Sequence, residues 1–386
     1  MTHQIDLRAA VDAGIINPDQ AAELVAFSNR SLLKTVADTS RATDDRETFR
    51  LIGGFNDIFV TIGIVLLLAG AAFSLDSVTG PSMSLQFTIM AGLIWLLAEY
   101  ISRVKRMKLP STVLALGFLF YISSLLQIWL TRRFDFAEPE NALAALVLLD
   151  QGQMAGLVSF SVILVVSVIY FWRFRVPVEA AIIALAATGL VTVAASELFM
   201  DEVARGQVQL SSVADVLLLI QRLLVLPLIS GLVIFATGIY LDFKDRNRLS
   251  TRSDAAFWLH LISAPMIVHP LFILSSGQDV GFGAIEPGAP ATAGLVGLMI
   301  IIVLISLAID RRALLIPTLT YFGALGIYRI VENASGNTGI PAFALVLLVI
   351  GALIIIFGMG WQRIRRIVIG SILPDRWLAA LPPIKA

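Results

Sequence analysis

The chain has 386 residues, of which 58% are hydrophobic and only 15% are charged. A soluble domain carries about 25% charged residues, so this composition argues against a soluble globular protein. The formal net charge is zero, which gives no indication of nucleic-acid binding, and the lack of cysteine excludes disulfides and thiolate metal sites.

Residues 1–55 predict a small cytosolic helical module. The stretch "DLRAAVDAG" is typical of a short amphipathic helix that ends near Gly14, and "NPDQAAELVAFSNRSLL" begins a second helix. Asn17 can cap this second helix, Pro18 suits its first position, and Gln20 stands where a capping box places its side chain. We expect this module to be the part of the chain that can contact a protein partner.

Apolar blocks follow, each close to the length of about 20 helical residues that crosses a bilayer. We count ten predicted spans, at residues 58–75, 85–102, 110–130, 155–172, 177–200, 222–241, 255–275, 292–309, 313–331 and 340–361. The segment 141–150 is too short to cross, and is either an interfacial helix or an extension of the fourth span. The predicted fold class is all-α: a polytopic transmembrane bundle at 56–361 with a cytosolic tail at 362–386.

The placement of lysine and arginine predicts the orientation, because basic loops stay in the cytosol. With the N-terminus inside, all but five of the 28 basic residues fall on the cytosolic side; the five are Arg132, Arg133, Arg205, Arg222 and Arg329. An error of one span would scramble this asymmetry, so the pattern supports an even number of spans with both termini cytosolic. Ten spans would permit two inverted halves of five, although no matching motifs are found.

Ionisable residues inside spans are costly, so each is a functional candidate. Glu99 lies one helical turn before Arg103, which favours a local pair. Glu179 stands in the first turn of its helix, where a carboxylate suits the helix dipole. Near the outer face, Glu197 and Arg222 either pair across a loop or gate a polar pathway.

The predicted seventh span, "AAFWLHLISAPMIVHPLFILS", holds two histidines and two prolines. His260 and His269 are separated by about 13.5 Å along a helix and point to opposite sides, so they cannot share a metal ion. Pro265 and Pro270 each remove a backbone donor, which predicts a kinked or unwound helix. Each histidine therefore either donates to a freed carbonyl or handles a proton or solute in a wet cavity.

A second group of charges follows the ends of two predicted spans. Asp242 and Asp310 come directly after the last apolar residue, where the helix dipole disfavours a carboxylate. Either the basic residues that follow neutralise each carboxylate locally, or the charges form a cytosolic network that docks the slightly acidic N-terminal module. The candidate network comprises Asp242, Lys244, Asp245, Arg246, Asp310, Arg311 and Arg312.

The opening "LRAAVDAGIINPDQAAELVAF", followed by the span "DIFVTIGIVLLLAGAAF", resembles bacterial predicted membrane proteins of the domain of unknown function 2157 type. These proteins also place a short cytosolic helical hairpin before a bundle of many spans. The resemblance covers about the first fifth of the chain. It implies a bacterial inner membrane, but no activity and no functional residues that can be carried over.

Two hypotheses for function remain, since no motif for catalysis or for binding a nucleotide, metal or other cofactor is found. The first is a transporter- or channel-like protein that moves a small solute or ion, with the proline-containing seventh span lining the path. The second is a non-catalytic scaffold or assembly partner in the lipid bilayer, acting through the N-terminal module. The scarcity of deep charge favours a scaffold or an uncharged substrate over a proton-driven pump. A hydrated cavity at His260 or His269 would favour transport, and a dry, packed seventh span would contradict it.

Overall fold

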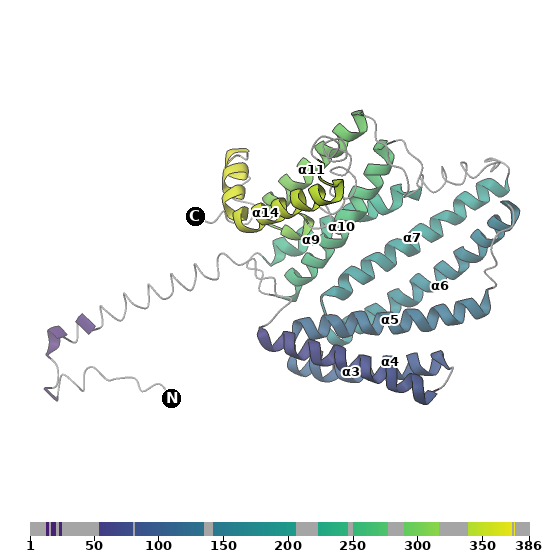
Figure 1. Cartoon of the computed structure of the whole chain (residues 1–386), viewed down its shortest axis with the longest axis horizontal. Coiled ribbons are helices and arrows are strands. Elements are labelled where there is room, and N and C mark those ends of the chain that lie inside the picture. Colours follow the sequence, from purple (N-terminus) through teal and green to yellow (C-terminus); the bar gives the residue numbers. More distant parts are fainter. Residues whose placement is uncertain are drawn as a thin grey trace. The chain divides into compact units, whose positions relative to one another are not determined.

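The computed structural model describes residues 13–14, 17–20, 23–24, 54–79, 82–134, 142–205, 223–245, 250–276, 289–315, 339–372 and 374. All regular elements in this part of the chain are helices, as Figure 1 shows. The chain divides into two units, Met1–Phe49 with Lys385–Ala386, and Arg50–Ile384. All the labelled helices belong to the second unit, and the predicted all-α class is confirmed.

Seven of the described helices are long and apolar enough to cross a membrane, at Phe55–Val78, Met83–Lys105, Lys108–Arg133, Gln151–Phe174, Val178–Leu198, Val225–Lys244 and Leu347–Ile372. A shorter apolar helix covers Val296–Ile309. The described elements, in chain order, are α3 (Phe55–Thr79), α4 (Met83–Ala98) with the π-helix η1 (Glu99–Lys105), α5 (Lys108–Arg133), α6 (Ala142–Phe174), α7 (Val178–Ala204), α9 (Val225–Lys244), α10 (Thr251–Ser276), α11 (Ala289–Ile309), the 3₁₀ turn η2 (Arg312–Leu314) and α14 (Ala342–Ile372).

Several boundaries differ from those expected. Residues 142–150 continue into α6 without a break, so this segment extends the fourth predicted span. The predicted ninth span, 313–331, lies almost wholly outside the described residues. The last described helix, α14, continues to Ile372 and so extends into the predicted tail. Its residues Ile364, Val368 and Ile369 pack with Leu307 of α11, which stabilises this extension.

The helix α10 is unbroken through Pro265 and Pro270, so the predicted unwinding is wrong. Each proline removes only one donor from a long helix, and α9 packs closely over the disturbed turn. A Cβ atom on Gly231 of α9 would lie 2.9 Å from the Cβ of Met266 and 3.2 Å from its carbonyl carbon. Met266 is the residue whose carbonyl loses its donor to Pro270, so close packing supports the helix at this point.

An aromatic cluster joins α4, α5 and α6. The ring centroid of Trp95 lies 4.9 Å from that of Phe174 and 5.8 Å from that of Tyr170. The ring of Tyr170 in turn stacks on Phe118 at 5.2 Å. Because these large side chains interdigitate, three helices share one buried core.

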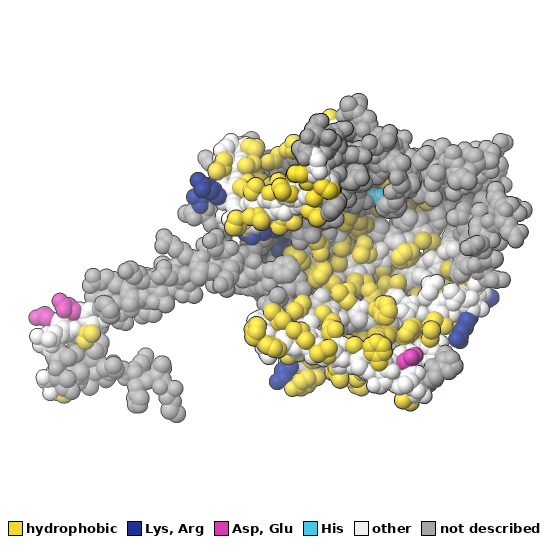
Figure 2. All heavy atoms as spheres, viewed as in Figure 1, with side chains coloured by type: hydrophobic (Ala, Val, Ile, Leu, Met, Phe, Trp, Pro, Cys, Tyr) yellow, Lys and Arg dark blue, Asp and Glu magenta, His cyan; other side chains and the backbone are white. Residues whose placement is uncertain are grey.

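The outward faces of the bundle are apolar. Figure 2 shows hydrophobic side chains spread over the helices, and Phe73, Trp172 and Met359 are each at least 78% exposed. Apolar patches of this extent are rare on soluble monomers. Lipid chains would cover them, which agrees with a multi-pass membrane protein.

The predicted capping box in the N-terminal segment is confirmed. The Asn17 backbone N–H donates to Oε1 of Gln20 at 3.0 Å, and the Gln20 N–H donates to Oδ1 of Asn17 at 2.8 Å. Residues 18–20 are helical, with Pro18 at the first position. Most of the predicted module at 1–55 lies outside the described residues, so its overall structure stays a prediction.

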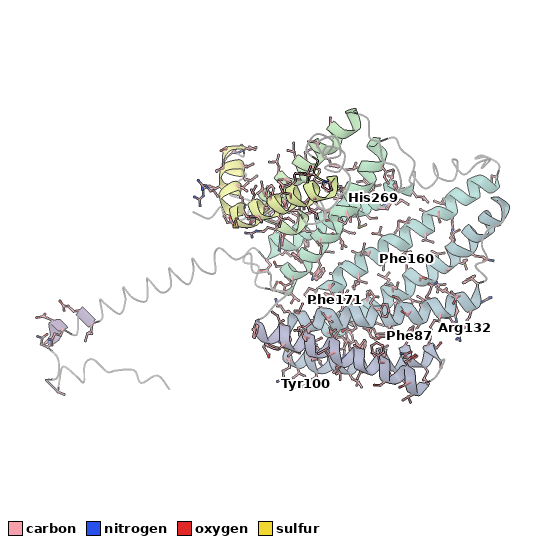
Figure 3. The ribbon with its side chains drawn as sticks, in the orientation of Figure 1. Phe87, Tyr100, Arg132, Phe160, Phe171 and His269 are labelled. Atoms are coloured by element: carbon pink, nitrogen blue, oxygen red, sulfur yellow. The ribbon has the colours of Figure 1, made fainter. Side chains whose placement is uncertain are left out.

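The contact between α6 and α7 generates a stability prediction. A Cβ atom on Gly189 would lie 2.3 Å from Cε1 of Phe160, the α6 side chain labelled in Figure 3. We expect Gly189→Ala to destabilise the protein by about 1–3 kcal/mol, because the ring must move in a packed interface. Unfolding of the purified protein in detergent, followed by tryptophan fluorescence, measures this change. Gly63→Ala is the control, since its Cβ atom would meet nothing within 4 Å, and equal stability of the two variants would contradict the packing.

Candidate functional site

A tight turn at the end of α11 directs two neighbouring charges to different helices. Asp310 adopts a left-handed conformation with φ 55°, a role usually filled by glycine. The N–H of Arg311 donates to the carbonyl of Ser306 at 3.0 Å, and the N–H of Asp310 donates to that of Leu307 at 3.4 Å. This Schellman arrangement, reinforced by the Ser306 hydroxyl on the Arg311 carbonyl at 2.6 Å, holds both side chains in place.

Arg311 forms a two-pronged ion pair with Asp242 at the end of α9. Its Nε donates to Oδ2 of Asp242 at 2.9 Å, and its Nη2 donates to Oδ1. The same Nη2 also donates to the hydroxyl of Ser253 on α10 at 3.0 Å. Arg311 is only 5% exposed, so one guanidinium holds α9, α10 and the end of α11 together in a largely desolvated setting.

His260 completes this cluster from α10. Its Nε2 lies 3.1 Å from Oδ2 of Asp242, and the side chain is fully buried. An ionised carboxylate only accepts hydrogen bonds, so Nε2 carries the proton. The ring rests on Phe235 at 5.2 Å and fits against Gly238, where a Cβ atom would come within 2.8 Å of Cε1. The surroundings of His260 are therefore closely packed.

Asp310 joins α11 to α14. Its Oδ1 accepts a hydrogen bond from Nε1 of Trp361 at 2.7 Å, and its Oδ2 lies 3.8 Å from Nη1 of Arg365. Arg365 is fully buried and donates from Nε to the carbonyl of Leu307 at 2.8 Å. A cation on the last carbonyls of a helix is favourable, so Arg365 caps α11 while it offsets the charge of Asp310.

The remaining residues of the predicted network have other contacts. The Lys244 amine lies over the ring of Tyr240 at 4.6 Å, and Arg312 lies over the ring of Trp361 at 5.4 Å. Asp245 accepts hydrogen bonds from the N–H and hydroxyl of Ser250, at 2.8 and 2.6 Å, which closes the turn into α10. Arg246 is outside the described residues. Asp242 is therefore paired with Arg311 from another helix rather than with Lys244.

The residues of the predicted polar pathway do not come together. His269, labelled in Figure 3, is half-buried and follows His260 by nine residues on α10. No metal-binding group of histidines and carboxylates occurs among the described residues. Glu197 is exposed on α7, and Arg222 falls in an undescribed segment, so their pairing stays a prediction. Pro265 and Pro270 lie within an intact helix, as noted above.

Further ion pairs connect helix ends at the same side of the bundle. The Lys108 amine at the start of α5 lies 2.7 Å from Asp254 at the start of α10. Arg173 at the end of α6 lies 2.7 Å from Glu99, which also makes the predicted pair with Arg103 at 3.4 Å. The sequence did not predict the pairs Lys108–Asp254 and Arg173–Glu99, because spacing along the chain indicates only pairs within one helix.

A second polar cluster lies between α6 and α7. Glu179, in the first turn of α7, is 2% exposed and has no ion-pair partner in the described part of the chain. The carboxyl group of Glu179 interacts with the hydroxyl of Ser167, and it is close enough to Tyr170 for the two side chains to interact electrostatically. The Oε2 of Glu179 and the hydroxyl of Tyr170 are both buried without a hydrogen-bond partner among described protein groups.

The π-helix η1 lies against α6 beside this cluster. A π-helix is rare and often marks a functional site, because its wider turn changes the direction of side chains. Here it contains Ser102, whose buried hydroxyl also lacks a partner among the described protein groups, and Glu99, which pairs with Arg173. Sequence reasoning placed Glu179 as a partner of the helix dipole, and it did not foresee either its complete burial or the π-helix.

The ion pair of Asp242 and Arg311 is expected to stabilise the fold. Removing one partner of a buried pair typically costs about 3–5 kcal/mol, because the other charge stays buried alone. We therefore expect Arg311→Gln to lower the free energy of unfolding by this amount. The double variant Arg311→Gln with Asp242→Asn should lose less free energy of unfolding than the sum of the losses in the two single variants. Equilibrium unfolding in detergent tests this, with the half-exposed Arg103→Gln as control, where the cost should stay below about 1 kcal/mol.

The indole of Trp361 gives a narrower test of the contact between α11 and α14. Trp361→Phe keeps an aromatic ring beneath Arg312 but removes the donor to Asp310. A buried acceptor left unsatisfied costs about 1–3 kcal/mol, and we expect a destabilisation of this size in the same unfolding measurement. Unchanged stability would mean that Asp310 does not depend on this hydrogen bond.

No protein-family model matches the chain, and no curated protein and no solved structure matches it. The resemblance of its first fifth to proteins of the domain of unknown function 2157 type stays a prediction. The function of the chain has to be inferred from its geometry.

Proposed function

We propose that the chain is a ten-span protein of the bacterial inner membrane, with both termini in the cytosol, that moves a small ion or solute across the bilayer. The seven long apolar helices support the membrane setting. Contacts between helix ends support the alternation of spans: Lys108 joins the starts of α5 and α10, and Arg173 joins the end of α6 to the end of α4. Each pair belongs to one predicted side.

Three further crossings complete the proposed ten. The α10 helix, 26 residues long, packs between α9 and α11 and has sufficient length to cross. The end of α11 and the end of α9 meet at the same cluster, so both ends lie on the same side. An even number of crossings, α10 and α11, therefore lies between them. For the ninth, the support is that Asp310 at the end of α11 meets Trp361 far along α14. A further crossing between α11 and α14 would bring these two residues to the same side.

The polar cluster at Glu179 carries the proposal of transport. A carboxyl group without an ionic partner is expensive inside an apolar bundle, and such residues commonly mark the path of an ion or solute. The close packing of His260 argues against a path past this residue of α10, where the prolines had suggested one. We therefore assign the Asp242–Arg311–His260 cluster to holding helices together, and place the candidate path beside Glu179.

The scaffold hypothesis has one observation in its favour. Residues Met1–Phe49 belong to a unit separate from the bundle. A separate unit suits contact with a protein partner.

Flux into proteoliposomes tests the proposal. Vesicles containing the purified protein should take up at least one member of a panel of protons, sodium, potassium and a small uncharged solute faster than empty vesicles. Glu179→Gln should abolish most of this flux, whereas Asp76→Asn, a change to an exposed carboxyl group on α3, should leave it unchanged. Wild-type flux no faster than that of empty vesicles would overturn transport and leave the scaffold. If the Glu179→Gln variant shows the same flux as the wild type, the transport path does not pass Glu179.

A further inference from the structure

Glu179 is surrounded by groups that leave its carboxyl without a counter-charge. Three basic side chains on neighbouring elements are already paired: Arg173 with Glu99, Lys108 with Asp254, and Arg311 with Asp242, while Arg175, in the turn before α7, is exposed. His260 also faces Asp242. Glu179 therefore has no ion-pair partner in the described part of the chain, and the hydroxyl groups of Ser167 and Tyr170 on α6 lie near its carboxyl group.

An ionised carboxylate in this position would be strongly disfavoured. The positive end of the α7 dipole favours the anion, but by much less than the desolvation of an unpaired ion costs. The group can become neutral by binding either a metal cation or a proton. A cation would meet the same positive helix end and would need a shell of several oxygen ligands, whereas a proton needs only one carboxyl oxygen.

We propose that Glu179 binds a proton, and that this carboxyl is where the protein takes up and releases the ion that it moves. The inference rests on the proposed function, because it names the transported or coupling ion. The proton is carried on one carboxyl oxygen, and its release returns the carboxylate with no other bond formed or broken. The buried Oε2, which has no other partner among the described protein groups, is the oxygen that carries it.

The side chains of α6 form the route to the surface. Ser167, Tyr170 and Arg173 follow one another at intervals of three residues, so they lie along one stripe of the helix. Hydroxyl groups both donate and accept hydrogen bonds, so Ser167 and Tyr170 can relay a proton when a water molecule or a side-chain rotation joins them, since the Tyr170 hydroxyl has no partner among the described protein groups. The stripe ends at the pair of Arg173 and Glu99, whose side chains are 28% and 29% exposed. Glu99 is thus the surface carboxylate through which protons enter.

Infrared difference spectroscopy of the protein reconstituted in lipid tests the inference independently of flux. The carbonyl stretch of a protonated carboxylic acid should be present at neutral pH in the wild type and absent in Glu179→Gln. It should persist in Glu197→Gln and shift in frequency in Tyr170→Phe, because the neighbouring hydroxyl is lost. Glutamine resembles a neutral glutamic acid, so Glu179→Gln should fold with an unchanged melting temperature at neutral pH.

The outcomes separate this inference from the proposed function. A band that does not change in Glu179→Gln would overturn the protonated site, as would a band abolished by added sodium or potassium, or failure of Glu179→Gln to fold. If the carbonyl band of protonated Glu179 is present but the proteoliposomes show no flux, the proton-binding site is supported and the transport proposal is rejected. If another ion or solute is transported and the carbonyl band is absent, the transport proposal is supported and the proposal of a protonated Glu179 is rejected.

Discussion

The cost of burying a charge governs how the described helices fit together. Asp242 stands at the carboxyl end of α9, where the helix dipole opposes it, and the structure offsets this with a guanidinium from beyond α11 and a histidine from α10. Because Arg311 is nearly fully buried, these three helices cannot separate without exposing or isolating a charge. The same requirement places Arg365 on the last carbonyls of α11 and brings α14 to that end.

Small residues make these contacts possible. The ring of His260 reaches Asp242 only because Gly238 leaves space for it on α9, and Gly231 allows the backbone of α9 to approach α10 where Pro270 has removed a donor. In membranes, helix association depends on close packing and polar contacts, since lipid is as apolar as the side chains it would replace. The prolines of α10 thus lie in a packed interface, and they do not open a cavity at His260.

Glu179 contrasts with Asp242 and gives the bundle its candidate for function. Both are carboxyls near helix ends, but one is surrounded by basic and histidine side chains and the other by hydroxyls. A paired charge stabilises a fixed arrangement. An unpaired carboxyl has to be neutralised by something that can leave again, which is the property required of a site that binds an ion reversibly. The π-helix that packs against α6 adds a second irregularity at the same place.

Length and apolarity along the chain predicted an all-helical protein with many spans, because each span satisfies its own backbone hydrogen bonds and must match the bilayer. The seven long apolar helices agree with a multi-pass membrane protein. Local chemistry was equally readable: the Asn17–Gln20 capping box and the Glu99–Arg103 pair follow from spacing within one turn. The partners of Asp242, Asp310 and Asp254 were not readable, because they lie on helices tens of residues away. Whether a carboxyl such as Glu179 is paired or isolated depends on which neighbouring faces surround it, and only the tertiary structure decides that.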